Sequence, residues 1–199
     1  MLKIKAQFLT SAAHKSQFLK PDKPIIAVCG KSNVGKSSFI NMLANQKKLA
    51  KVSKEPGRTR LVNYFDMGDF ILADLPGYGY ARVSHDEKLK WAHLLDDFFA
   101  DKGAIAHVFS LADIRHDPTA DDRQMIEYLT YHILPFTVVA TKADKLPKSQ
   151  VKNRCRAIAN FLKIGADNVI PVSSLNKTGK LEVLDKVEQI LTAGSDFNE

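Results

Sequence analysis

Apolar and polar positions follow two rhythms along this chain, and together they predict an α/β domain. Short apolar runs that end in polar or glycine-containing turns predict strands near 25–29, 61–66, 70–74, 105–112, 136–141 and 168–172. Stretches with apolar residues at helical spacing predict helices near 36–45, 86–101, 119–132, 148–163 and 179–193. The alternation favours a mostly parallel six-stranded sheet with helices on both faces. The short link between the second and third strands predicts one antiparallel edge strand.

Details of the predicted helices follow from individual positions. The stretch 86–101 has a core-facing stripe of Leu89, Ala92, Leu95 and Phe99. Trp91 falls off that stripe and is expected to be half exposed. Thr119 and Asp122 form a capping pair at the start of the third helix. The chain divides into an N-terminal arm (1–23), one domain (24–193) and a C-terminal tail (194–199).

The first strand leads directly into a glycine-containing loop that resembles a phosphate-binding site. Residues from Gly30 to Ser37 match the pattern G-x-x-x-x-G-K-[ST] between the strand 25–29 and the helix 36–45. Glycine at both ends lets successive N–H groups point at one anion, and the helix N-terminus adds favourable partial charge. Lys36 is placed to reach the β- and γ-phosphates, and the Ser37 hydroxyl to ligate Mg²⁺.

Four further segments follow the first helix or the ends of later strands, where an open α/β sheet binds ligands. Thr59 is predicted to ligate Mg²⁺ when a γ-phosphate is present, and Asp74 to hold the same ion. The Gly77 N–H is predicted to donate to the γ-phosphate, and loss of that phosphate would release both loops. Asp144 accepts two hydrogen bonds from guanine, and adenine would leave the carboxylate unpaired. Ser173 and Ser174 follow the last strand, and their backbone is predicted to face guanine O6.

With these motifs in order, the chain resembles the EngB-type GTPases of the bacterial TrmE–Era–EngA–EngB group. The more diagnostic stretches are 31–38, 56–60, 74–80, 115–119 and 122–125. The resemblance implies a Ras-like P-loop GTPase fold, binding of GTP and GDP with Mg²⁺, and a role in assembly of the large ribosomal subunit. The expected nucleotide contacts are Gly30, Lys31, Ser32, Asn33, Val34, Gly35, Lys36, Ser37, Ser38, Pro56, Gly57, Arg58, Thr59, Asp74, Leu75, Pro76, Gly77, Thr141, Lys142, Ala143, Asp144, Val172, Ser173 and Ser174. The expected catalytic residues are Lys36, Thr59, Gly77 and Asn33, and the expected metal ligands are Ser37, Thr59 and Asp74.

Three positions bear on the mechanism. Thr141 stands where related GTPases have Asn, which predicts weaker guanine binding with specificity kept by Asp144. Tyr78 stands where many have a water-orienting Gln, and a phenol cannot replace that amide. Unassisted hydrolysis is therefore expected to be slow, about 10⁻⁴–10⁻³ s⁻¹. Asn33 has two interpretations of equal weight: a K⁺ ligand, as in related GTPases, or a turn residue in a left-handed conformation.

The charge is distributed unevenly. Residues 1–60 carry 13 Lys and Arg against Asp22 and Glu55, a net +11, whereas the remainder carries 16 against 20, a net −4. The basic residues around the first switch are Lys47, Lys48, Lys51, Lys54, Arg58 and Arg60. Such a patch is typical of an RNA partner, with a solvated surface as the alternative.

Three functions remain open. The leading hypothesis is a GTP-hydrolysing switch on the large ribosomal subunit or its precursor, contacting rRNA and ribosomal proteins. The alternatives are a regulatory GTPase with a protein effector and an ATP-using P-loop enzyme, which Asp144 and Ser173 disfavour. Two cysteines favour reduced thiols, no stretch is apolar enough to span a membrane, and the N-terminus lacks the features of a signal peptide. We therefore expect a cytoplasmic protein with no membrane partner. A monomer is a separate expectation.

Overall fold

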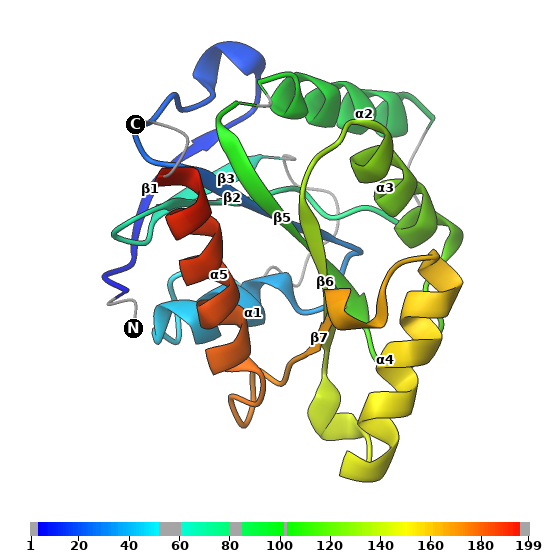
Figure 1. Ribbon diagram of the computed structural model, residues 1–199. Coiled ribbons are helices and arrows are strands. Elements are labelled where there is room, and N and C mark those ends of the chain that lie inside the picture. The colour runs from blue at the N-terminus through cyan, green and yellow to red at the C-terminus, as the bar shows by residue number, and fades with distance from the viewer. Residues whose placement is uncertain (1–3, 52–60, 80–84, 102, 196–199) are drawn as a thin grey trace.

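The strands of this protein form one twisted sheet in a computed structural model that describes residues 4–51, 61–79, 85–101 and 103–195 (Figure 1). The strands in those ranges are β1 (Gln7–Ala12), β2 (Ile25–Gly30), β3 (Val62–Asp66), β4 (Ile71–Asp74), β5 (Ile105–Asp113), β6 (Phe136–Thr141) and β7 (Val169–Pro171). Their order across the sheet is β1-β3-β4-β2-β5-β6-β7. Within the described chain, β3 pairs antiparallel with β1 and β4, and the other neighbouring strands pair in parallel.

The Ras-like class is confirmed, but the prediction of six strands is wrong by one. Residues 7–12, which the sequence analysis assigned to the N-terminal arm, form β1 beside β3, so β3 is not the edge. The pairing register shifts between Phe8 and Thr10, which breaks the alternation that marks a strand in the sequence. Ser11 donates a hydrogen bond to Asn63 (Oγ to Oδ1, 2.7 Å), and the Ala12 side chain is fully buried. Tertiary pairing therefore decides the structure of this segment.

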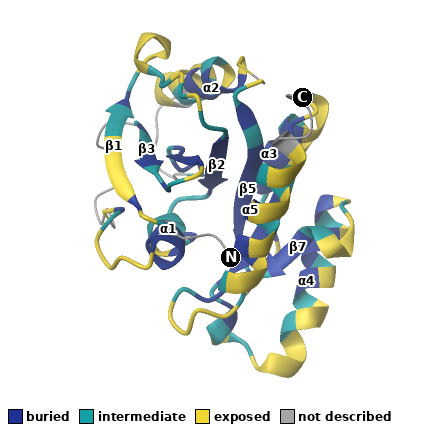
Figure 2. Cartoon of the chain, turned by 60° about the vertical axis from the view of Figure 1, so that its left-hand side comes forward, coloured by how far each residue is buried: buried dark blue, intermediate teal, exposed yellow. Residues whose placement is uncertain are grey.

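Helices cover both faces of the sheet. The long helices in the described ranges are α1 (Lys36–Ala44), α2 (His85–Phe99), α3 (Ala120–Tyr131), α4 (Lys148–Leu162) and α5 (Lys180–Ser195). One core cluster joins the sheet to α2, α3 and α4, and the other joins it to α1 and α5. Apart from β1, whose first residues are exposed, the strands are mostly buried, while the helices turn exposed surfaces outward (Figure 2). Short 3-10 turns occur at η1 (Lys15–Gln17), η2 (Ala143–Lys145) and η3 (Ala166–Asn168).

Two of the detailed helix predictions are confirmed and one is partly wrong. Trp91 is half-buried, and Thr119 with Asp122 forms a complete capping box at α3. The α2 stripe is shifted, because Leu89 is 47% exposed, and the buried side chains are those of Leu94, Leu95, Phe98 and Phe99. Within the described chain, no helix is both long enough and apolar enough to cross a lipid bilayer.

Candidate functional site

The loop between β2 and α1 has the backbone geometry of an anion cradle. Gly30 lies where β2 passes β5, and a Cβ there would be 2.9 Å from the Leu111 carbonyl oxygen, so a larger residue does not fit. Asn33 (φ 63°) and Gly35 (φ 111°) take left-handed conformations that turn the chain tightly before α1 begins. The loop thereby arranges backbone N–H groups around the N-terminus of α1.

Lys36 and Asp74 meet at the centre of the site, from the first turn of α1 and the end of β4. Lys36 Nζ lies 3.2 Å from Asp74 Oδ1, and both side chains are largely buried. Burial raises the pKa of the Asp74 carboxyl, and the charge of Lys36 acts in the opposite direction. Within the described chain, Asp74 Oδ1 accepts no hydrogen bond of good geometry.

Mg²⁺ fits these residues. A buried carboxylate oxygen without a hydrogen bond is suited to a hard cation or to a water bound to it. The neighbouring Ser37 hydroxyl donates to the Lys51 carbonyl oxygen (3.1 Å), which leaves its own oxygen lone pairs for a ligand. Asp74 and Ser37 are therefore the described residues that would hold Mg²⁺. Thr59, the third expected ligand, lies outside the described residues, as do Pro56, Gly57 and Arg58.

The segment after β4 packs directly against the phosphate loop. The Ser32 N–H donates to the Tyr78 carbonyl oxygen (2.9 Å), and the Tyr78 N–H donates to the Gly30 carbonyl oxygen (3.4 Å). A Cβ at Gly77 would lie 3.3 Å from Ser32 N and 3.4 Å from Gly30 O. A side chain at Gly77 would therefore be tight and would push the phosphate loop by a few tenths of an ångström, so the two predicted γ-phosphate elements lie in direct contact here.

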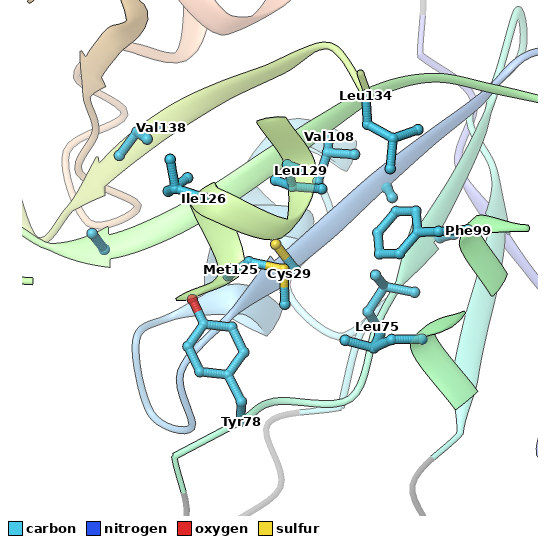
Figure 3. Packing of buried hydrophobic residues seen from close by; sticks show 14 of the residues in the cluster. Cys29, Leu75, Tyr78, Phe99, Val108, Met125, Ile126, Leu129, Leu134 and Val138 are labelled. Atoms are coloured by element: carbon cyan, nitrogen blue, oxygen red, sulfur yellow. The ribbon is translucent and has the colours of Figure 1, made fainter. Parts of the chain in front are cut away.

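The Tyr78 side chain points into the core (Figure 3). Its hydroxyl donates to Asp122 Oδ1 (2.9 Å), and its ring packs edge-on against Trp91, whose Nε1 donates to the Pro76 carbonyl oxygen (3.1 Å). Burial, together with the nearby Cys29 and Asp122, raises the pKa of the phenol well above its usual value, so the hydroxyl keeps its proton. Tyr78 thus connects the phosphate loop to α3, and its phenol does not orient a water at that loop in this structure. The pairing of Tyr78 with Asp122 was not predicted from the sequence.

Asp144 and its neighbours form the predicted base-reading end. Asp144 Oδ1 accepts a hydrogen bond from Ser173 Oγ (2.6 Å), and Lys145 Nζ lies 3.3 Å from Oδ2. The Ser173 hydrogen bond, more than Lys145, holds the pKa of the Asp144 carboxyl below its usual range. The Ala143 N–H donates to the Val172 carbonyl oxygen (3.0 Å), which joins the loop after β6 to the loop that contains Ser173 and Ser174.

Two side chains connect this base-reading end to the phosphate loop. Thr141 Oγ1 donates to the Val34 carbonyl oxygen (2.7 Å), and Lys142 Nζ donates to the Asn33 carbonyl oxygen (2.9 Å). The Thr141 hydroxyl therefore braces the phosphate loop. The expectation of weaker guanine binding stays a prediction. Asn33 has the left-handed backbone conformation expected of a turn residue. Its role as a K⁺ ligand stays a prediction.

Asp113 is a site residue that the sequence analysis missed. Its carboxylate accepts from Lys142 Nζ (2.8 Å) and from two nitrogens of Arg115 (2.9 and 2.7 Å). Burial alone would raise the pKa of this carboxyl, but the hydrogen bonds from Arg115 and Lys142 outweigh it and lower the pKa. Asp113 fixes Lys142 over the phosphate loop. Its place at the end of β5, just before the diagnostic stretch 115–119, is the signal that could have found it.

The described site residues therefore gather at the carboxyl ends of the parallel strands. Gly30 ends β2, Asp74 ends β4 and Thr141 ends β6, and the remaining site residues directly follow these strands and β7. This is the edge at which doubly wound sheets bind nucleotides.

Comparisons with known proteins agree with this geometry. A protein family described as "50S ribosome-binding GTPase" matches residues 25–142. The "Probable GTP-binding protein EngB" of Streptococcus pneumoniae is 45% identical over 184 residues, which is 92% of this chain and 94% of the relative. The protein of the same name from Streptococcus gordonii is 46% identical over 176 residues, 87% of this chain and 89% of the relative.

Solved structures show the same fold. The crystal structure of a probable GTP-binding protein EngB superimposes with a TM-score of 0.71 at 19% identity, over 85% of this chain and 99% of that one. Aquifex aeolicus Era bound to GDP and AlF4⁻ gives a TM-score of 0.63 at 20% identity, over 84% of this chain and 56% of that one. The chain thus belongs to the EngB-type P-loop GTPases, and it binds and hydrolyses GTP.

Proposed function

We propose that this GTPase is a nucleotide-dependent switch that acts in the cytoplasm during assembly of the large ribosomal subunit, with Mg²⁺ as its cofactor. Two observations support the ribosomal role: the description of the matching family and the net charge of +11 on residues 1–60. A strongly basic surface attracts the phosphate backbone of RNA.

A hydrogen bond links the predicted metal site to the segment 47–51, which contains Lys47, Lys48 and Lys51. This contact is the main structural support for the proposal. The Ser37 hydroxyl, a predicted Mg²⁺ ligand, donates to the carbonyl oxygen of Lys51. Asn41 of α1 holds the same segment, because its amide donates to the carbonyl oxygens of Lys47 (3.3 Å) and Ala50 (3.0 Å), and its oxygen accepts from the Ala50 N–H (2.7 Å). The side chains of Lys47, Lys48 and Lys51 are exposed. A change at the metal site therefore has a short path to the lysines that would meet RNA.

Each described site residue has a distinct expected role in the reaction. Lys36 and the backbone N–H groups of the loop would bind and orient the phosphates, and the Gly77 N–H would stabilise the γ-phosphate. When bound, Mg²⁺ would neutralise charge that develops on the phosphate oxygens. Asp144 would select guanine, while Thr141 and Lys142 hold the loop in place. A partner would have to complete the site, because Tyr78 supplies no water-orienting group.

Co-sedimentation with purified large ribosomal subunits tests the proposal. We expect tighter association with a non-hydrolysable GTP analogue than with GDP. Lys47→Ala/Lys48→Ala should weaken that association without changing guanine-nucleotide affinity. Lys90→Ala/Lys186→Ala, which removes the same charge from α2 and α5, is the matched control. Equal sedimentation of the wild type in the two nucleotide states would exclude the switch, and binding only to a protein effector would favour the regulatory alternative.

A further inference from the structure

The helix α4 carries more net positive charge than any other long helix of the described chain. Residues 148–163 contain Lys148, Lys152, Arg154, Arg156 and Lys163, and no Asp or Glu. In contrast, α2, α3 and α5 each carry more acidic than basic residues. The net charge of −4 on residues 61–199 conceals this local excess of positive charge.

Four of these cations have no acidic partner within the described ranges. Arg154 is committed to the fold, since it donates to the Ile114 carbonyl oxygen and to Asp117 Oδ1, both at 3.0 Å. The side chains of Lys148, Lys152, Arg156 and Lys163 are exposed and form no ion pair with any described carboxylate. We call these four residues the α4 basic face.

The α4 basic face has a regular and rigid geometry. Lys148, Lys152 and Arg156 stand four residues apart, so they share one side of the helix with a rise of about 6 Å between neighbours. The opposite side of α4 is fixed in the core through Cys155, Ile158, Ala159 and Leu162. The helix that carries these cations is already ordered and packed on the core. A partner that binds them therefore does not have to order this segment.

The positive charges of the α4 basic face destabilise the helix α4. Lys148 occupies the first turn, where the helix dipole disfavours a cation, and that turn contains no acidic residue. Like charges four residues apart also repel each other. A polyanion would relieve both effects.

We propose that the α4 basic face docks on the phosphate backbone of structured RNA. The exposed residues between the cations are Ser149, Gln150, Asn153 and Asn160, which can donate to phosphate and sugar oxygens. A membrane-surface helix would need an outward apolar side, and the core of a protein interface would be depleted in lysine. The absence of exposed aromatic residues on this face argues against base stacking, and so favours a double-stranded region.

This contact rests on the proposed ribosomal function and adds a second anchor to it. The face follows the base-reading loop that contains Asp144, and it has no described contact with the segment after Gly77. RNA binding there should therefore be equal with GDP and with a GTP analogue, whereas the contact through Lys47 and Lys48 should depend on the nucleotide.

Fluorescence anisotropy with a labelled 20-base-pair RNA duplex of mixed sequence tests the inference. Lys152→Ala/Arg156→Ala removes two phosphate contacts, so the log–log salt slope should fall by about 1.6 and binding at 0.1 M salt should weaken roughly 40-fold. The loss should be the same in both nucleotide states. Lys90→Ala/Lys186→Ala removes equal charge and should bind as the wild type does.

Two further measurements separate the outcomes. Thermal unfolding should show the α4 variant to be at least as stable as the wild type, because the substitutions relieve repulsion. An α4 variant that binds the duplex with wild-type affinity and salt slope would overturn the inference. A variant that loses binding to anionic lipid vesicles but not to the duplex would also overturn it. Failure of the wild type to sediment with large subunits, with duplex binding intact, would instead refute the ribosomal function.

Discussion

Replacing Tyr78 by phenylalanine tests whether this residue acts through structure or through chemistry. The substitution removes one hydroxyl and keeps the ring that packs against Trp91. The lost hydroxyl donates to Asp122 Oδ1 at 2.9 Å in the core, and Asp122 is itself buried. The other oxygen of Asp122 keeps its hydrogen bonds from the Thr119 N–H (2.7 Å) and hydroxyl (2.8 Å).

The expected magnitude follows from the kind of bond that is lost. A hydrogen bond to a charged group contributes about 1.5–3 kcal/mol, and a buried acceptor left unpaired adds to the cost. We expect Tyr78→Phe to lower the free energy of unfolding by about 2 kcal/mol. For a domain of this size the melting temperature should fall by about 4–8 °C. GTP hydrolysis by the folded variant should change less than about threefold, because the phenol does not face the phosphate loop.

Urea unfolding and single-turnover GTP hydrolysis measure the two effects separately. Tyr131→Phe removes the hydroxyl of an exposed tyrosine and should change the stability by no more than about 0.5 kcal/mol. A Tyr78→Phe protein with wild-type stability and a tenfold slower reaction would refute this reasoning, since it would place the phenol in the chemical step.

Three further predictions concern base recognition, pH and cations. Asp144→Asn should shift preference from guanine to xanthine nucleotides in a competition assay, and wild-type ATP affinity within a few-fold of GTP would contradict the role of Asp144. Burial lowers the pKa of His107 from 6.5 to about 4, so folding stability should be lost as pH falls from about 6.5 towards 4, by up to about 3 kcal/mol. Denaturant titrations should show a weaker pH dependence in His107→Gln, which can still bond to Thr137, and an unchanged pH dependence would exclude His107 as its source. If Asn33 holds K⁺, hydrolysis should slow when Na⁺ replaces K⁺ and Asn33→Ala should remove the difference, whereas a rate insensitive to K⁺ would exclude the cation site.

Local chemistry explains why much of the fold was predictable from the sequence. The apolar run 25–29, the glycines of the loop and the Thr119–Asp122 capping box each specify structure within a few residues. The same is true of the strand ends that gather Asp74, Thr141 and Ser173 at one edge.

The missed features depend on contacts between distant parts of the chain. The strand β1 is stabilised by pairing with β3, some 50 residues away, and its irregular register hides its alternation. Tyr78 and Asp122 are 44 residues apart, and Asp113 meets Lys142 across 29. Helical spacing alone placed the core-facing side of α2 about one position away from its observed place. For this reason Leu89 was assigned to the core. Such pairings become visible only when the elements are packed.

The hydrogen bond from Thr141 to the Val34 carbonyl has a consequence for the entropy of nucleotide binding. That carbonyl belongs to the same planar peptide as the Gly35 N–H, so holding the oxygen on the side of β6 directs the N–H to the opposite side. The peptide is thus oriented by a side chain from a strand more than a hundred residues later. Binding to a donor that is already oriented costs less conformational entropy. If the loop held this orientation only part of the time, its apparent affinity for phosphate would be multiplied by that fraction. The Thr141 hydroxyl at the end of β6 therefore contributes to phosphate affinity without touching the phosphate.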